Sequence, residues 1–346
     1  MKVDHPVLIT GAAFVVVVAG MQAAASLLVP FLLAAFIAII CLPPVYSLHA
    51  RGVSTGFAVL IIGLALVLTG ILIAAFVSSS VADFSGNLPN YQARLQLQTD
   101  GLIAWLAGFG LQLDSQLIRD NLSPSAAMGM AGKLLAGLGN ALANTFLIVL
   151  TVIFLLLEAS ALPHKWAIMG EHAPSGDHFR RFISSVNSYL AIKGWVSLAT
   201  GAIITIWLAI LGVDYPLLWG LVAFLFNFVP NIGSIIAAIP AVLLALIQLG
   251  PATALAAGLG YVAVNIIMGN VIEPRYLGRG VGLSTLVVFL SLVFWGWILG
   301  PVGMLLSVPL TMIVKLALEA GDDTHWLGIL LGPDIEPEQQ SPEEIS

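Results

Sequence analysis

The residues best suited to binding a solute are uncharged polar side chains beside breaks in apolar sequence. Two long apolar segments, residues 215–249 and 284–318, are each interrupted near the middle. The polar and helix-breaking residues at the two interruptions are Asn227, Pro230, Asn231, Gly233, Ser234, Gly300, Pro301 and Gly303. A broken helix frees backbone N–H and C=O groups, which are tolerated at membrane depth only inside protein or along a wet cavity. Two such breaks in corresponding positions predict the substrate path of a transporter.

The two interruptions form a weak internal repeat, because PNIGSIIAAIPAVLL can be aligned with GPVGMLLSVPLTMIV. Their apolar halves are shorter than the roughly 20 residues that a spanning helix needs. Each segment is therefore predicted to be a pair of short helices or a re-entrant hairpin. A half-helix that restarts after Pro230 or Pro301 would point N–H groups toward an oxygen-rich molecule. The alternative is a proline kink that only shapes the bundle.

A third group of polar residues consists of Asn265 and the sequence Glu273-Pro274-Arg275 that follows it. Asn265 lies on the apolar helix that leads into it and is assigned to the substrate path. A carboxylate and a guanidinium group beside a polar-lined helix could exchange partners between states, so Glu273, Pro274 and Arg275 are predicted to form a gate or ion-coupling site. The alternative is a cytoplasmic loop with one local ion pair.

The composition indicates whether the protein that carries these residues is surrounded by water or by lipid. Hydrophobic residues make up 59% of the 346 residues and charged residues only 9%, against about 45–50% and 25% in soluble domains. A soluble globule is excluded. The chain has no P-loop, no zinc-protease motif and no nucleophile motif, so neither an ATPase of its own nor any other enzyme is predicted. No cofactor and no metal site are expected, and the single cysteine cannot form an intrachain disulfide.

The apolar runs predict an all-α polytopic membrane protein with about eight membrane segments, two of them the broken or re-entrant hairpins. The uninterrupted spans are predicted at residues 7–28, 30–42, 56–77, 141–157, 193–213 and 252–271. The run at 30–42 is expected to start near Pro30, to end at Pro43-Pro44, and to return across the membrane as the second arm of a hairpin. Lys and Arg in the short loops place both termini in the cytoplasm.

Four regions follow from this pattern. Residues 1–77 are predicted to be a scaffold of membrane helices, and residues 78–140 an extracytoplasmic segment with an amphipathic helix after Pro89. Residues 141–320 would form the transport unit with its two broken hairpins. Residues 321–346 read as an acidic, disordered cytoplasmic tail.

The C-terminal motifs carry a family resemblance. FNFVPNIGSIIAAIPAVLLAL (226–246) and GNVIEPRYLGRGVGLSTLVVFLSLVFWGWILGPVGMLLSVPL (269–310) resemble the autoinducer-2 exporter-like family, also called the autoinducer permease-like family. The resemblance implies a transporter that exports a small polar signalling molecule, or in some relatives exchanges Na⁺ or Li⁺ for protons. It also implies a homo-oligomer, a pentamer, in which a C-terminal unit moves against an N-terminal scaffold. Where relatives often have glutamine before the Glu-Pro, this chain has Asn265.

We therefore expect an exporter of a small polar molecule of the autoinducer-2 type in the bacterial inner membrane. A Na⁺(Li⁺)/H⁺ antiporter is the first alternative and a non-transporting membrane scaffold the second. The expected partners are a polar solute, H⁺ or Na⁺ in the antiporter case, the lipid bilayer and further copies of the chain. No nucleic acid is expected, because the chain has no basic patch.

Overall fold

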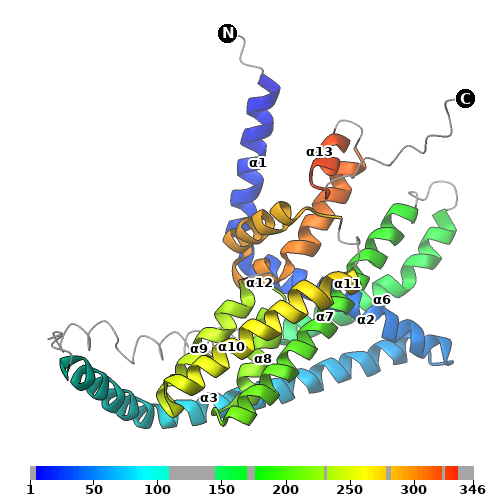
Figure 1. The fold of residues 1–346 in the computed structure, drawn as a ribbon. Coiled ribbons are helices and arrows are strands. Elements are labelled where there is room, and N and C mark those ends of the chain that lie inside the picture. The colour runs from blue at the N-terminus through cyan, green and yellow to red at the C-terminus, as the bar shows by residue number, and fades with distance from the viewer. Residues whose placement is uncertain are drawn as a thin grey trace, which may run out of the picture. The chain divides into compact units, whose positions relative to one another are not determined.

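The protein is built from helices. The computed structural model describes residues 5–108, 145–169, 176–229, 232–277, 282–321 and 324–333. Every regular element within these ranges is a helix (Figure 1). The chain forms two compact units, one of residues 30–174 and 190–276, the other of residues 1–29, 175–189 and 277–346.

The larger unit contains two groups of helices. It contains the greater part of α2 (Ala25–Ala50), α7 (Gly176–Leu211) and α11 (Glu273–Leu277). Its other elements are α3 (Thr55–Gly108), α6 (Thr145–Met169), α8 (Pro216–Phe226), α9 (Gly233–Leu249), α10 (Pro251–Asn265) and the π-helix η2 (Ile266–Ile272). Cys41 and Val45 of α2, Val59 of α3 and Leu156 of α6 share one apolar core. The second core joins the far half of α3 to α7, α8, α9 and α10 around the buried Trp219.

The smaller unit contains α1 (His5–Ala23), α12 (Thr285–Glu319) and α13 (His325–Leu330). Phe14 of α1 stacks on Phe294 of α12, with ring centroids 6.3 Å apart. Ser284 caps the N-terminus of α12 by accepting a hydrogen bond from the N–H of Val287. The carbonyl of Leu331, just after α13, accepts a hydrogen bond from the N–H of Ser284, so α13 is held against the start of α12.

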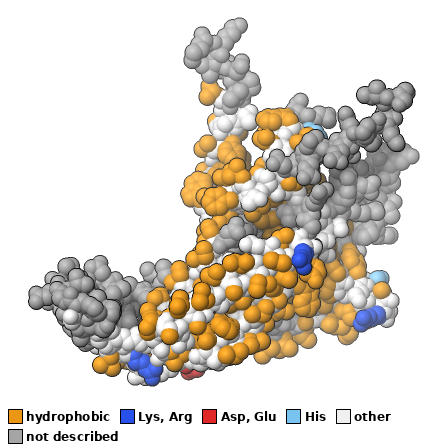
Figure 2. All heavy atoms as spheres, viewed as in Figure 1, with side chains coloured by type: hydrophobic (Ala, Val, Ile, Leu, Met, Phe, Trp, Pro, Cys, Tyr) orange, Lys and Arg blue, Asp and Glu red, His pale blue; other side chains and the backbone are white. Residues whose placement is uncertain are grey.

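Long apolar helices confirm an all-α polytopic membrane protein. Six helices in the described part of the chain are long and apolar enough to cross a bilayer. Figure 2 shows hydrophobic side chains over α7 and α10 with few charged groups among them. Large hydrophobic side chains remain exposed on these helices, for example Trp195 and Leu255. Such a surface fits hydrocarbon rather than water.

Three predicted boundaries differ in the structure. The span predicted at 7–28 is interrupted by a one-residue turn at Ala24, and α2 already begins at Ala25. The helix does not start near Pro30 or end at Pro43-Pro44. All three prolines lie inside α2. Val45, directly after Pro44, is buried in the core shared by α2, α3 and α6, so tertiary packing outweighs the backbone hydrogen bonds that the prolines cannot donate.

The predicted third span and the predicted amphipathic helix are one continuous helix. α3 runs from Thr55 to Gly108 with Pro89 inside it. Packing of the far half of α3 against α8 and α9 keeps the chain helical through this proline, as described below. Residues 109–140 of the predicted extracytoplasmic segment and most of the predicted tail, residues 334–346, lie outside the described residues. The division into four regions stays a prediction.

Candidate transport site

The first interrupted segment folds back on itself as a helical hairpin. α8 ends at Phe226, and α9 restarts at Gly233. At the open end, the N–H of Asp214 donates to the side-chain oxygen of Gln248 at 2.9 Å, and Nε2 of Gln248 donates to the carbonyl of Gly212 at 3.2 Å. The residues that precede α8 and those that end α9 are therefore side by side.

Gly233 allows the two arms to approach each other at the hairpin tip. A Cβ atom on Gly233 would lie 1.8 Å from the carbonyl oxygen of Phe226. No side chain fits there. The sequence predicted Gly233 as a substrate-path residue; the structure gives it a packing role at the closed end of the hairpin, next to the predicted Pro230 and Asn231, which lie outside the described residues.

The second interrupted segment, in the smaller unit, is built in the same way. Gly300 has a φ of 68°, which breaks α12 into two arms. The indole N–H of Trp295 donates to the hydroxyl of Thr311 at 3.0 Å, a contact that a straight helix could not make across 16 residues. A Cβ on Gly303 would lie 2.0 Å from the carbonyl oxygen of Trp295. Gly233 and Gly303 are aligned in the internal repeat. Each allows the two arms of its hairpin to approach closely at the tip.

Asn227, at the end of α8, is fixed to α7. Its Nδ2 donates to Oγ of Ser197 at 2.9 Å, and both side chains are buried. One turn before Ser197 on the same face of α7 lies Lys193, whose side chain is only 4% exposed. The closed end of the first hairpin and Lys193 therefore belong to one polar region along α7.

Lys193 forms a bidentate ion pair with Glu273. Its Nζ donates to both carboxylate oxygens at 2.7 Å, and the Glu273 side chain is 18% exposed. Glu273 follows directly on the π-helix η2, a wide helical turn that often marks functional sites. Pro274 and the predicted gate partner Arg275 are exposed on α11. The described partner of Glu273 is Lys193, 80 residues earlier, rather than the adjacent arginine.

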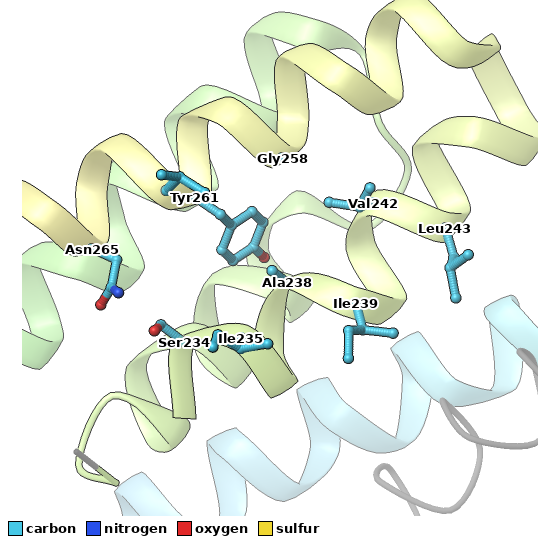
Figure 3. Close-up of a pocket in the computed structure, with 10 residues that line it drawn as sticks. Ser234, Ile235, Ala238, Ile239, Val242, Leu243, Gly258, Tyr261 and Asn265 are labelled. Carbon is cyan, nitrogen blue, oxygen red and sulfur yellow. The ribbon is translucent and has the colours of Figure 1, made fainter. Parts of the chain in front are cut away.

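Ser234 and Asn265 line one groove between α9 and α10, together with Tyr261 (Figure 3). The groove has a volume of about 380 Å³. Ser234 and Asn265 lie at the end near the hairpin tip, Tyr261 lies beside Ala238, and mainly aliphatic side chains line the rest. The structure brings Ser234 and Asn265 together at this groove, whereas Asn227 faces Ser197. Gly300, Pro301 and Gly303 lie on the second hairpin, in the other unit.

Lys193, Ser197 and Tyr261 were missed by the sequence reasoning. A signal for two of them existed: Lys193, Ser197, Gly201 and Thr205 recur at a spacing of four in an apolar helix. Such a stripe of small and polar residues marks a face that packs closely on protein. The carbonyl of Gly201 and the hydroxyl of Thr205 lie against Gly220 of α8, so close that a Cβ there would overlap Thr205. No comparable pattern marks Tyr261.

The fold is that of a polytopic membrane protein, and the sequence has no P-loop motif. Residues 12–323 match the AI-2E family of transporters, and the chain belongs to this family. It is 42% identical over 318 residues to the AI-2 transport protein TqsA of Escherichia coli, covering 92% of each chain. It is 40% identical over 339 residues to a putative transport protein of Haemophilus influenzae, covering 96% of this chain and 97% of that one. The putative transport protein YrrI of Bacillus subtilis is 27% identical over 309 residues.

Proposed function

We propose that this protein exports a small polar molecule of the autoinducer-2 type across the bacterial inner membrane. The observation that carries the proposal is the position of polar side chains around the tip of the first hairpin: Ser234 and Asn265 face one groove, and Asn227 is held by Ser197. The relationship to TqsA supports autoinducer-2 as the class of solute. Both hairpins re-enter the membrane from the side where their two ends lie.

The proposed path uses Asn227, Pro230, Asn231, Gly233, Ser234 and Asn265 in the first hairpin region, and Gly300, Pro301 and Gly303 at the second tip. Amide and hydroxyl groups exchange hydrogen bonds with a polyhydroxylated solute at small cost, because they carry no charge to desolvate. Glu273, Pro274 and Arg275 act as the gate, with Lys193 as the partner that Glu273 releases. The working form is a homo-oligomer, a pentamer, with both termini in the cytoplasm.

The experiment is flux of radiolabelled autoinducer-2 through proteoliposomes that contain only this protein. Asn265→Ala should lower the rate about tenfold or more, because it removes both a donor and an acceptor from the path. Asn270→Ala is the matched control, since Asn270 is exposed on η2 five residues further on. Equal rates in the two variants would remove Asn265 from the path. Absence of flux in the unmodified protein would favour the scaffold alternative.

A second candidate is Na⁺(Li⁺)/H⁺ antiport, favoured by the Lys193–Glu273 pair. A carboxylate beside a buried ammonium group can bind a cation only after the ammonium group moves away. Cation binding at Glu273 would therefore compete with the Lys193–Glu273 ion pair. The test is sodium-driven proton movement in the same proteoliposomes. Antiport instead of export would be established if Glu273→Gln abolished the sodium-driven proton movement and neither the unmodified protein nor the variant carried autoinducer-2.

A further inference from the structure

The helical turn that presents Glu273 contains one residue more than an α-helical turn needs. The π-helix η2 separates α10 from α11, and the backbone N–H of Glu273 donates to the carbonyl of Met268, five residues earlier. In an α-helix the same bond spans four residues. Such wide turns are rare and occur mostly as single turns inside α-helices, frequently at functional sites. The chain at η2 can therefore be wound in two ways, as the present π-helix or as an α-helix.

Winding η2 as an α-helix would separate Glu273 from Lys193. One residue of an α-helix corresponds to a rotation of about 100° and a rise of about 1.5 Å, so release of the additional residue turns α11 by this amount relative to α10. The Cα atom of Glu273 would move by about 3.5 Å around the helix axis, and the carboxylate, which lies farther out, would move more. The hydrogen bonds of 2.7 Å to Nζ of Lys193 would be lost. Ile272 would take the position that Glu273 occupies in the π-helical form.

The ion pair stabilises the π-helical form against the α-helical form. The backbone alone favours the α-helix, which is why π-helical turns are rare. The Lys193 ammonium group is only 4% exposed and reaches both carboxylate oxygens of Glu273 while the turn is wide, so the pair opposes rewinding. Pro274 has no N–H and donates to no carbonyl of η2 in either form. Rewinding therefore costs no hydrogen bond at Pro274.

We infer that η2 is the moving part of the gate. In the π-helical form Glu273 pairs with Lys193, and in the α-helical form α11 is turned and the pair is open. The open form leaves the Lys193 ammonium group free to donate to an oxygen of the solute, in the polar region that it shares with Ser197 and Asn227. This inference rests on the proposed role of Glu273 as a gate, and it adds the movement that releases Glu273 and the group that then binds the solute.

The test is a distance measurement by electron paramagnetic resonance between spin labels at Ile210→Cys on α7 and Tyr276→Cys on α11. The labels are placed in the full chain with Cys41→Ala, in proteoliposomes. Both labelled side chains are exposed, and Ile210 lies about 25 Å along α7 from Lys193, which suits this method. Glu273→Gln removes the charge that holds the turn wide, so the distance should shift by about 3 Å or more.

Deletion of Ile267, an exposed residue of η2, removes the additional residue and leaves Glu273 beside Lys193 in an α-helix. Combined with Glu273→Gln, this deletion should leave the labels at the distance measured in the unmodified protein. Ile267→Ala keeps the number of residues and is the matched control, so with Glu273→Gln it should still show the shift. The absence of a shift in Glu273→Gln, or a shift of the same size after the deletion, would overturn the inference.

A second deletion separates this effect from a general loss of folding. Leu255 is exposed on the regular α-helix α10. Its deletion changes the register of Gly260, where a Cβ would lie 2.0 Å from Nε1 of Trp207, so the unfolding temperature should fall. Deletion of Ile267 should leave the unfolding temperature the same or raise it. Equal falls in the two deletion variants would show that η2 holds no additional residue and would also overturn the inference.

Flux of autoinducer-2 links this movement to transport. Deletion of Ile267 alone should abolish flux although the Lys193–Glu273 pair and the fold are kept, because the gate stays closed. Unchanged flux in this variant would mean that rewinding of η2 does not open the path. Absence of flux in the unmodified protein would refute the proposed export instead, and the label distances would still decide whether η2 rewinds.

Discussion

Lys193 and Glu273 show how a charge can be kept inside an apolar helix bundle. Each alone would be costly to bury, and together they neutralise each other through two hydrogen bonds of 2.7 Å. The ammonium group is nearly inaccessible, so it depends on this carboxylate. The exposed pair of Glu158 and Lys165 has water available to both partners and matters much less.

Glu273→Gln should lower the free energy of unfolding, because it leaves the Lys193 ammonium group without its counter-ion. We expect a loss approaching the about 3–5 kcal/mol that is typical of breaking a buried ion pair. Thermal unfolding in detergent micelles measures the loss. Glu158→Gln is the matched control and should cost less than about 1 kcal/mol. The exchange of both charges, Lys193→Glu with Glu273→Lys, should recover much of the stability. Equal losses in Glu273→Gln and Glu158→Gln would contradict this assignment.

Gly233→Ala and Gly303→Ala should both disrupt folding, because the added methyl group would overlap a backbone oxygen at each hairpin tip. We expect each variant to lose about 3 kcal/mol or more of the free energy of unfolding, which is the upper end of the range for overpacked sites. Gly258→Ala is the control, since its methyl group meets Val242 at ordinary distance. The yield of monodisperse protein and its unfolding temperature measure the effect. Normal stability of either tip variant would show that its hairpin arms do not approach so closely.

At the scale of elements, the far half of α3 holds the open end of the first hairpin. Tyr91 donates to the Asp214 carboxylate at 2.7 Å, and Asn87 donates to the hydroxyl of Tyr215 at 2.9 Å. Further along α3, Arg94 and Gln98 donate to the last carbonyls of α9. Before these residues on α3, Phe84 packs edge-on against Trp219. This packing keeps α3 helical through Pro89.

Tyr91→Phe should loosen this open end, because a hydrogen bond to a carboxylate contributes about 1.5–3 kcal/mol. Hydrogen exchange followed by mass spectrometry should show faster exchange at residues 212–216 and 246–250. Tyr46→Phe, at an exposed tyrosine of α2, is the matched control and should leave exchange unchanged. Unchanged protection in Tyr91→Phe would mean that the aromatic packing alone holds the hairpin.

The hydropathy pattern predicted the helices of this fold better than it predicted their ends. The spans predicted at 56–77 and 252–271 lie within described helices, and the span predicted at 193–213 follows α7 to its end at Leu211, since hydrocarbon solvent requires long apolar helices whatever packs on them. Proline positions misled the reading at Pro43-Pro44 and at Pro89. Both sites lie in helices with buried neighbours, and local propensity yields to tertiary packing there.

At the scale of the whole molecule, the two arms of each hairpin are joined at the open end, opposite the tip, by hydrogen bonds within the same unit. Gln248 joins the ends of the first, and the Leu331 carbonyl and Lys315 side chain hold residues 282–284 at the second. Under the proposed topology, the first hairpin enters from outside and the second from the cytoplasm. Each would then reach into the membrane without crossing it.

Cysteine accessibility tests this topology in a Cys41→Ala background. Leu217→Cys and Ala252→Cys should both react with a membrane-impermeant maleimide from outside the cell, since they flank one re-entrant hairpin. Leu286→Cys and Ile329→Cys should both react only in inside-out vesicles. Arg51→Cys and Gln96→Cys are the controls for the cytoplasmic and outer sides. Labelling of Leu217→Cys and Ala252→Cys from opposite sides would show that the first segment crosses the membrane.

The sequence by itself determined the class of protein, the places of most membrane helices and the two breaks that form hairpin tips. These follow from local quantities, namely hydropathy summed over about 20 residues and the backbone limits of glycine and proline. Only the tertiary structure decided that Glu273 pairs with Lys193, that Asn227 bonds Ser197 and that Tyr261 faces an aliphatic groove. Partner choice depends on which helix faces meet, and that depends on packing between residues far apart in the chain.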